Sequence, residues 1–147
     1  MSAESVGRAA DGSVMTQERM AEFGAAWRAG DIEALMAFMT DDCVFRSSVG
    51  PGPGADFHGP EQVRRGFELM LQHDAGGESR AGAVVIRGDF GASTWSYAFT
   101  AKDGSERVVR GCDLFEFDGD RIRVKDAYRK VEGDIGVDRR DGSARRA

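Results

Sequence analysis

Asp113, Asp126 and Tyr128 are the side chains whose types and spacing suit acid–base chemistry. They lie in two strand-like segments joined by Asp118-Gly119, a dipeptide typical of a two-residue β-hairpin turn. With such a turn, Gly111 pairs with Asp126, and all three side chains share one face of the hairpin because side chains alternate along a strand. The rest of that face is apolar, and a carboxylate is rarely buried among apolar groups without a partner or a function.

The chemistry expected of this face is proton transfer. Asp113 and Asp126 become diagonal neighbours, with β-carbons roughly 5–8 Å apart. Burial and mutual repulsion raise the pKa of at least one such carboxyl group, which then donates a proton while its ionised neighbour acts as a base. Tyr128 adds a hydrogen-bond donor. Two alternatives stay open: a structural role for both aspartates, and a turn with one extra residue, which would bring Arg123 and Lys125 inward.

Other candidate ligand contacts come from the first half of the sequence. Ser47 is expected to line a pocket and to hydrogen-bond a ligand or water. His58 ends a Gly/Pro-rich loop, residues 50–59, at the expected pocket mouth, although a partly exposed loop histidine is the simpler interpretation. Four aromatic residues are expected in the core or pocket wall, with core packing favoured for the second and third: Phe23, Trp27, Phe67 and Phe115.

One domain is expected over residues 15–131, between a flexible N-terminus (1–14) and a flexible C-terminal tail (132–147). Three helices are expected in the N-terminal half, the first two capped by Thr16 and Asp31 and the third beginning at Pro60. Strand-like runs lie at 43–49, 83–87, 92–101, 106–117 and 121–131. Helices followed by an antiparallel meander predict an α+β fold, with the helices on one face of a curved sheet.

Three aromatic side chains alternate along the run 92–101. With Asp103-Gly104 as a tight turn, Trp95, Tyr97 and Phe99 lie on the outer face of the sheet. An exposed aromatic patch of this size usually marks an interface, so a homodimer through this face is expected. The alternative is a bulged turn that sends these rings into the pocket.

Composition excludes several classes of function. The 147 residues are 41% hydrophobic with a net charge of −5, which disfavours a nucleic-acid binder because no basic face attracts phosphates. No apolar run suits a membrane span or a signal peptide, so a cytoplasmic protein is expected. Cys43 and Cys112 are expected to be reduced. No metal-ligand cluster, phosphate loop or dinucleotide motif points to a cofactor, and none is expected.

Four motifs follow one another in an order and spacing typical of a known fold. They are Phe23-Gly-Ala-Ala-Trp-Arg-Ala-Gly-Asp31, Asp41-Asp-Cys-Val-Phe45, His58-Gly-Pro-Glu-Gln-Val63 and Gly111-Cys-Asp-Leu-Phe-Glu-Phe-Asp-Gly-Asp-Arg-Ile122. Through them the chain resembles the nuclear transport factor 2-like superfamily, in its SnoaL-like and ketosteroid-isomerase-like branch. The resemblance implies a cone-shaped sheet around the helices, a pocket at its open end, and frequent homodimers.

The resemblance also limits the reaction. Steroid isomerases of this superfamily use a tyrosine, an aspartate base and a protonated aspartic acid, and the matching positions hold Phe23, Ser47 and Asp113. Phe23 cannot donate a hydrogen bond and Ser47 is too weak a base, so steroid isomerisation by that route is not expected. SnoaL-like cyclases support an acid role for Asp113.

The function expected is proton transfer, as in an isomerase, cyclase or dehydratase (lyase), on a small apolar carbonyl or hydroxyl compound. The alternatives are a non-catalytic ligand-binding or accessory protein, and water activation as in epoxide hydrolases. Those hydrolases bridge two aspartates with an arginine, which is not evident here because Arg110, Arg121 and Arg123 fall on the other face.

Overall fold

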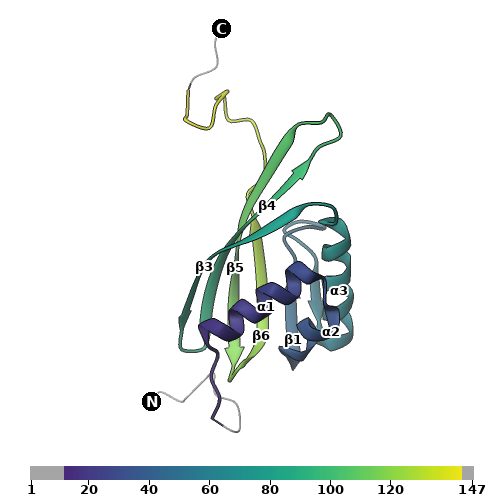
Figure 1. Cartoon of the computed structure of the whole chain (residues 1–147), viewed down its shortest axis with the longest axis vertical. Helices are drawn as coiled ribbons and strands as arrows, with labels where there is room; N and C mark the ends of the chain where they lie inside the picture. Colours follow the sequence, from purple (N-terminus) through teal and green to yellow (C-terminus); the bar gives the residue numbers. More distant parts are fainter. Residues whose placement is uncertain (1–11, 144–147) are drawn as a thin grey trace.

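Three helices pack against an open six-stranded sheet in the computed structural model, which describes residues 12–143 (Figure 1). Residues 1–11 of the predicted flexible N-terminus and residues 144–147 of the predicted tail lie outside this range. The predicted α+β class is confirmed. No helix among residues 12–143 combines the length and apolar composition needed to cross a membrane.

The helices begin and end at the residues that the sequence indicates. Helix α1 (Gln17–Ala29) begins after Thr16, whose side chain accepts a hydrogen bond from the Arg19 N–H at 3.1 Å. It ends at Gly30, which takes the left-handed conformation (φ 66°) that glycine adopts without steric cost. Helix α2 (Ile32–Ala37) is capped by Asp31 in the same way as α1 is by Thr16. Helix α3 (Gly59–His73) has its proline in the first turn, as predicted.

The strands form one mixed sheet in the order β2-β1-β6-β5-β4-β3. Their bounds are β1 Met39–Arg46, β2 Asp56–His58, β3 Glu78–Arg87, β4 Phe90–Thr100, β5 Glu106–Asp118 and β6 Arg121–Arg129. All neighbours are antiparallel except β1 and β6, which run parallel. The prediction of loop throughout residues 50–59 was wrong at its end, because β2 pairs there with β1.

The pairing of β5 with β6 differs from the predicted register. Asp113 lies opposite Ala127, and Leu114 lies opposite Asp126. Next to the turn, the pairing is offset by two residues from the predicted pairing. An even offset leaves each side chain on its predicted face. A β-bulge then leaves Arg123 without a partner in the ladder, and one extra residue sends every following side chain of β6 to the opposite face.

The pairing of β4 with β5 is also shifted by one residue. Thr100 pairs with Glu106, so the connecting loop has five residues in place of the predicted two. Trp95 therefore lies opposite Gly111, and Tyr97 lies opposite Val109, on the face that carries Asp113. The prediction that Trp95 and Tyr97 point outward was wrong. The alternative, a bulged turn that sends these rings into the pocket, was correct in where it puts them.

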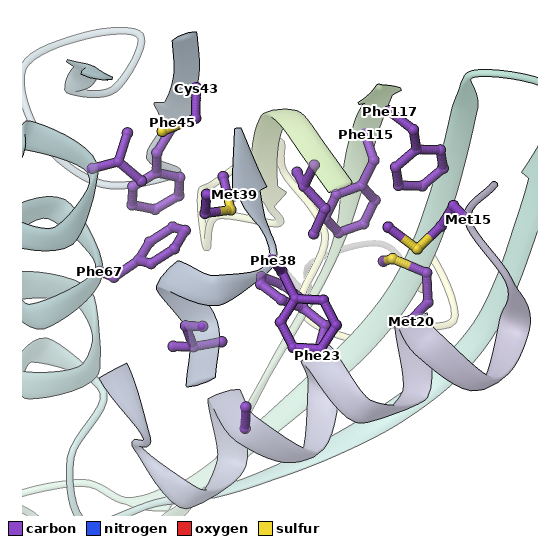
Figure 2. Packing of buried hydrophobic residues seen from close by; sticks show 14 of the residues in the cluster. Met15, Met20, Phe23, Phe38, Met39, Cys43, Phe45, Phe67, Phe115 and Phe117 are labelled. Atoms are coloured by element: carbon purple, nitrogen blue, oxygen red, sulfur yellow. The ribbon is translucent and has the colours of Figure 1, made fainter. Parts of the chain in front are cut away.

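Aromatic and sulfur-containing side chains form the core between the helices and the sheet (Figure 2). Phe115 and Phe117 on β5 stack at 6.0 Å and face Met20 and Phe23 on α1. Phe67 on α3 is fully buried and packs edge-on against the Phe45 ring at 4.9 Å. This core holds α1 and α3 against the sheet and so fixes the walls of the cavity described next.

Candidate functional site

A cavity of about 250 Å³ lies between α1 and strands β3 to β6. Its walls are mainly apolar, as is common for sites that bind small organic molecules. Six aromatic rings contribute to the lining: Phe23, Trp27, Phe45, Trp95, Tyr97 and Phe115. Two ion pairs interrupt this apolar surface.

The first ion pair joins Asp113 on β5 to Lys125 on β6. The Lys125 ammonium nitrogen lies 3.4 Å from Oδ2 of Asp113, and the Trp95 indole N–H donates to Oδ1 at 3.1 Å. The side chains of Asp113 and Lys125 are only 11% and 6% exposed. Such a buried charge is tolerated only when an opposite charge and hydrogen bonds offset the loss of water.

Aromatic faces complete the surroundings of Lys125. Its ammonium lies 4.5 Å from the centre of the Trp27 ring and 5.0 Å from that of Phe45, distances at which the ring quadrupole attracts a cation. An ammonium has three N–H donors, and among residues 12–143 Asp113 is its one ion-pair partner. Lys125 therefore combines a fixed position with capacity to donate to a ligand oxygen.

The second ion pair joins Asp74, after α3, to Arg129 at the end of β6. The Arg129 guanidinium donates to Asp74 Oδ2 at 3.0 Å and to Ser48 Oγ at 2.9 Å. Tyr97 donates its hydroxyl proton to the Asp74 backbone carbonyl. Burial, and secondly the Asp74 carboxylate, raise the pKa of Tyr97 above its ordinary value, so this phenol stays a hydrogen-bond donor.

Gly111 allows Trp95 to reach Asp113. A β-carbon at position 111 would overlap the Trp95 ring and the Tyr128 carbonyl oxygen. Without that β-carbon, the indole can lie across β5, where its N–H meets the Asp113 carboxylate two residues along the strand. Gly111 thus leaves the room that the Trp95 indole needs to reach the carboxylate.

The structure does not bring together the predicted pair of aspartates. Asp126 and Tyr128 lie on the face of β6 opposite to Asp113, and neither lines the cavity. The Tyr128 hydroxyl donates to Asp126 Oδ2 at 3.0 Å, and this bond is the main cause that raises the pKa of Tyr128. Arg46 lies 3.8 Å from the same carboxylate oxygen.

The predicted ligand contacts divide into two groups. Phe23, Trp27 and Phe115 line the cavity. Three other residues do not line it: Ser47, His58 and Phe67. Buried Ser47 accepts the Val49 N–H with its own hydroxyl, the neighbouring Ser48 taking the place in the wall, while His58 is exposed before α3 and Phe67 belongs to the core.

The predicted interface aromatics are also redistributed. Trp95 and Tyr97 line the cavity, and half-buried Phe99 stacks on Tyr97 with ring centres 5.5 Å apart. The outer-face patch built from these three rings is therefore not formed.

Three residues that were not predicted from the sequence as site residues line the cavity: Lys125, Arg129 and Trp95. One signal could have found the first two: Lys125, Ala127 and Arg129 alternate along β6, and they face inward in the alternative with one extra residue. No group of three or more potential metal ligands occurs within the described part of the chain.

Comparison with known proteins identifies relatives of this fold. A family model described as a SnoaL-like domain matches residues 20–124. An NTF2-like protein of unknown function from Mesorhizobium loti is 25% identical, with a TM-score of 0.63 over 78% of this chain and 89% of that one. No curated protein matches.

Two further solved structures were obtained with small molecules. One, from Catenulispora acidiphila, has a ketosteroid isomerase-like fold and is in complex with trimethylamine; it is 21% identical, with a TM-score of 0.61 over 78% of this chain and 86% of that one. TerC, co-crystallised with polyporic acid, is 16% identical, with a TM-score of 0.61 over 77% and 89%. At these identities both show the fold alone.

Proposed function

The chain belongs to the SnoaL-like family, and we propose that it binds a small, largely apolar organic molecule with a carbonyl or hydroxyl group and transfers a proton on it. The observation that carries this proposal is the buried Asp113–Lys125 pair in the wall of an aromatic cavity. Solved proteins of this fold with trimethylamine or polyporic acid support a binding role for such a cavity.

The roles differ from those expected for two aspartates. Asp113, held between an ammonium and an indole N–H, acts as the base that removes a proton from the carbon next to a ligand carbonyl. Lys125 donates to the oxygen on which negative charge then develops. Asp113 then returns the proton to another carbon of the same conjugated system, which completes an isomerisation, or gives it to a hydroxyl group on the neighbouring carbon, which leaves as water and completes a dehydration.

Exchange of carbon-bound hydrogen tests this role without knowledge of the natural substrate. We expect the protein to speed the exchange of the α-hydrogens of 2-tetralone with D₂O, measured by proton NMR. Removing a positioned base costs roughly 100-fold or more, so Asp113→Asn should return exchange to near the buffer rate. Asp126→Asn, on the opposite face of the sheet, is the matched control and should exchange like the wild type.

A ligand-binding protein without catalysis is the second candidate. One observation favours it: both carboxylate oxygens of Asp113 already have partners, so the pair is electrostatically complete without a substrate. Exchange no faster than in buffer, together with saturable binding of the ketone, would support this candidate and overturn the catalytic one.

Epoxide hydrolase-like water activation gains no support from the cavity. In its wall, Arg129 contacts Asp74 while Lys125 contacts Asp113, and no arginine in the described residues bridges both carboxylates.

A further inference from the structure

Lys125 differs from the other lysines of the chain in both burial and surroundings. The sequence holds three lysines, and two of them, Lys102 and Lys130, are exposed. The side chain of Lys125 is only 6% exposed, yet it forms part of the cavity lining. Its amine is therefore the one lysine amine that a ligand bound in the cavity would meet away from bulk water.

The ammonium group of Lys125 is held by neighbours that do not occupy it fully. Asp113 Oδ2 lies 3.4 Å from the nitrogen, farther than the roughly 2.9 Å of a well-formed N–H···O bond. The Trp27 and Phe45 rings attract the positive charge, but they offer ring faces and no acceptor atom. The nitrogen is thus placed in the cavity wall without being locked to one partner.

A lysine amine bonds to the carbon of an aldehyde or ketone when two conditions are met: a nearby base takes its proton, and the charged product is stabilised. Asp113 is the base within reach. An iminium carries the same charge on the same nitrogen as the ammonium does, so the carboxylate and the ring faces stabilise both. The Arg129 guanidinium in the same wall cannot take this role, because it does not lose a proton.

We infer that Lys125 forms a Schiff base with an aldehyde or an unhindered ketone bound in the cavity. Asp113 accepts a proton from the ammonium, the freed lone pair bonds to the carbonyl carbon, and Asp113 returns the proton to the carbonyl oxygen. Asp113 then carries a second proton from the nitrogen to the new hydroxyl group, which leaves as water while the C=N bond forms. One ammonium and one carbonyl group give one iminium and one water, and Asp113 ends unchanged.

This inference rests on the proposed function, because it assigns a covalent reaction to the same bound carbonyl group. An iminium withdraws electrons from the neighbouring carbon more strongly than a carbonyl group does, so Asp113 removes a proton from that carbon more readily. Esters and amides do not form iminium ions with amines. The ligands that react in this way are therefore apolar compounds with a free aldehyde or ketone group.

Reductive trapping with 2-naphthaldehyde and sodium cyanoborohydride tests the inference. The reductant converts an iminium into a stable amine, which peptide mass spectrometry then locates. Burial alone would make Lys125 the least labelled of the three lysines. Because the cavity holds the aldehyde against the amine, we expect the reverse order at micromolar aldehyde, with roughly tenfold more adduct at Lys125 than at Lys102 or Lys130. Labelling of Lys125 no greater than that of the exposed lysines would overturn the inference.

A cavity-filling variant shows whether the labelling depends on the cavity. Ala127 lines the cavity and is half-buried, whereas Ala25 on α1 is exposed and outside it. Ala127→Phe should remove the excess of adduct at Lys125, and the matched control Ala25→Phe should keep it. Excess 2-tetralone should protect Lys125 in the wild type without any substitution. An excess of adduct that persists both in Ala127→Phe and with 2-tetralone present would overturn the inference.

Displacement of the neutral fluorescent probe 1-aminoanthracene separates failure of the inference from failure of the proposed function. If 2-tetralone displaces the probe and exchanges its α-hydrogens through Asp113, but Lys125 is not preferentially trapped, the inference fails and the proposed function stands. If 2-tetralone neither displaces the probe nor exchanges faster than in buffer, and Lys125 is not trapped, both fail.

Discussion

Lys125 determines what the Asp113 carboxylate can do. Without the ammonium, Asp113 would keep only the Trp95 N–H as a partner in a mainly apolar cavity wall. With it, the pair is neutral overall, and under the proposed function one member accepts protons while the other donates hydrogen bonds. This division of roles between unlike groups replaces the two like charges that the sequence indicated.

Lys125→Met should destabilise the protein by roughly 3–5 kcal/mol, because it leaves a buried carboxylate without its counter-ion. Combining it with Asp113→Leu should recover most of this loss, since an apolar pair of similar volume needs no charge balance. Urea unfolding of both single variants and the double variant measures the coupling. A loss below about 1 kcal/mol for Lys125→Met would show that water reaches the pair.

Because of Tyr97, the free energy of unfolding should fall at alkaline pH. Its folded pKa is raised, by burial first and Asp74 second, above an unfolded value of about 10. Between those two values the unfolded chain binds fewer protons than the folded chain, so the free energy of unfolding falls as pH rises. Below pH of about 10 the contribution is fully present.

Tyr97→Phe should therefore lose stability less steeply above pH of about 10 than the wild type. Tyr128, whose pKa is raised by its bond to Asp126, retains its own share of the fall. Guanidinium unfolding at a series of alkaline pH values measures both slopes. Identical slopes for wild type and Tyr97→Phe would contradict the effect.

At the scale of elements, the sequence predicted the helices well because their ends are local events. Thr16, Asp31 and Gly30 act through bonds within a few residues of themselves. The strand faces were predicted poorly because they depend on whether the segments that join β4 to β5 and β5 to β6 hold an odd or an even number of residues. A five-residue loop in place of two shifts the β4–β5 pairing by one residue, and the bulge at Arg123 adds one residue to β6. The Asp-Gly turn dipeptides do not distinguish these cases from tight two-residue turns.

The candidate site was affected accordingly. Asp113 kept its inward position because β5 follows the predicted alternation. Lys125 faces the cavity in place of Asp126, because the bulge lies between the turn and both residues and so exchanges their faces. The aromatic walls were predicted in part, from α1 and β5, whereas Trp95 was assigned to the outer face.

Deletion of Arg123 tests the bulge directly. The pairs on both sides of it, Phe117 with Ile122 and Glu116 with Val124, remain aligned when the unpaired residue is removed. We expect this variant to fold, to unfold cooperatively and to keep the probe-binding cavity. In a hairpin without a bulge the same deletion would invert every later side chain of β6, so loss of folding would contradict the observed register.

Deletion of Asp126 is the matched control. It removes a paired residue and should turn Arg129 away from Asp74, with loss of cooperative unfolding. Near-ultraviolet circular dichroism and urea titration compare the two deletions.

For the molecule as a whole, a homodimer through the outer face of the sheet remains a prediction, now with different residues. Val108 is 61% exposed and Tyr128 is 50% exposed, both on the face opposite to the cavity. Exposed apolar side chains on a sheet face favour association.

Light scattering should give twice the molar mass of one chain for the wild type, and that of one chain for Val108→Asp. Ile135→Asp introduces the same charge at a side chain that is 88% exposed and outside the sheet, so it should remain dimeric. A wild-type protein that is monomeric at all concentrations would exclude this interface.

One wall of the cavity belongs to a strand with a single neighbour. Strand β3 is at the edge of the sheet, bonded only to β4 and interrupted by a bulge between Ala81 and Val84. Asp113 and Lys125, in contrast, lie on β5 and β6, each flanked by strands on both sides. Local opening costs least where backbone pairing is one-sided, so a ligand can enter past β3 while the Asp113–Lys125 pair stays in place.

Amide hydrogen exchange makes this asymmetry visible. In the free protein the amides of β3 should exchange with deuterium faster than those of β5, and a bound ligand should slow β3 much more than β5. Equal protection of both strands by a ligand would instead mean that the sheet opens as one unit. In the expected case, the time a ligand stays bound is set by the fluctuation of one edge strand and not by the chemistry beside it.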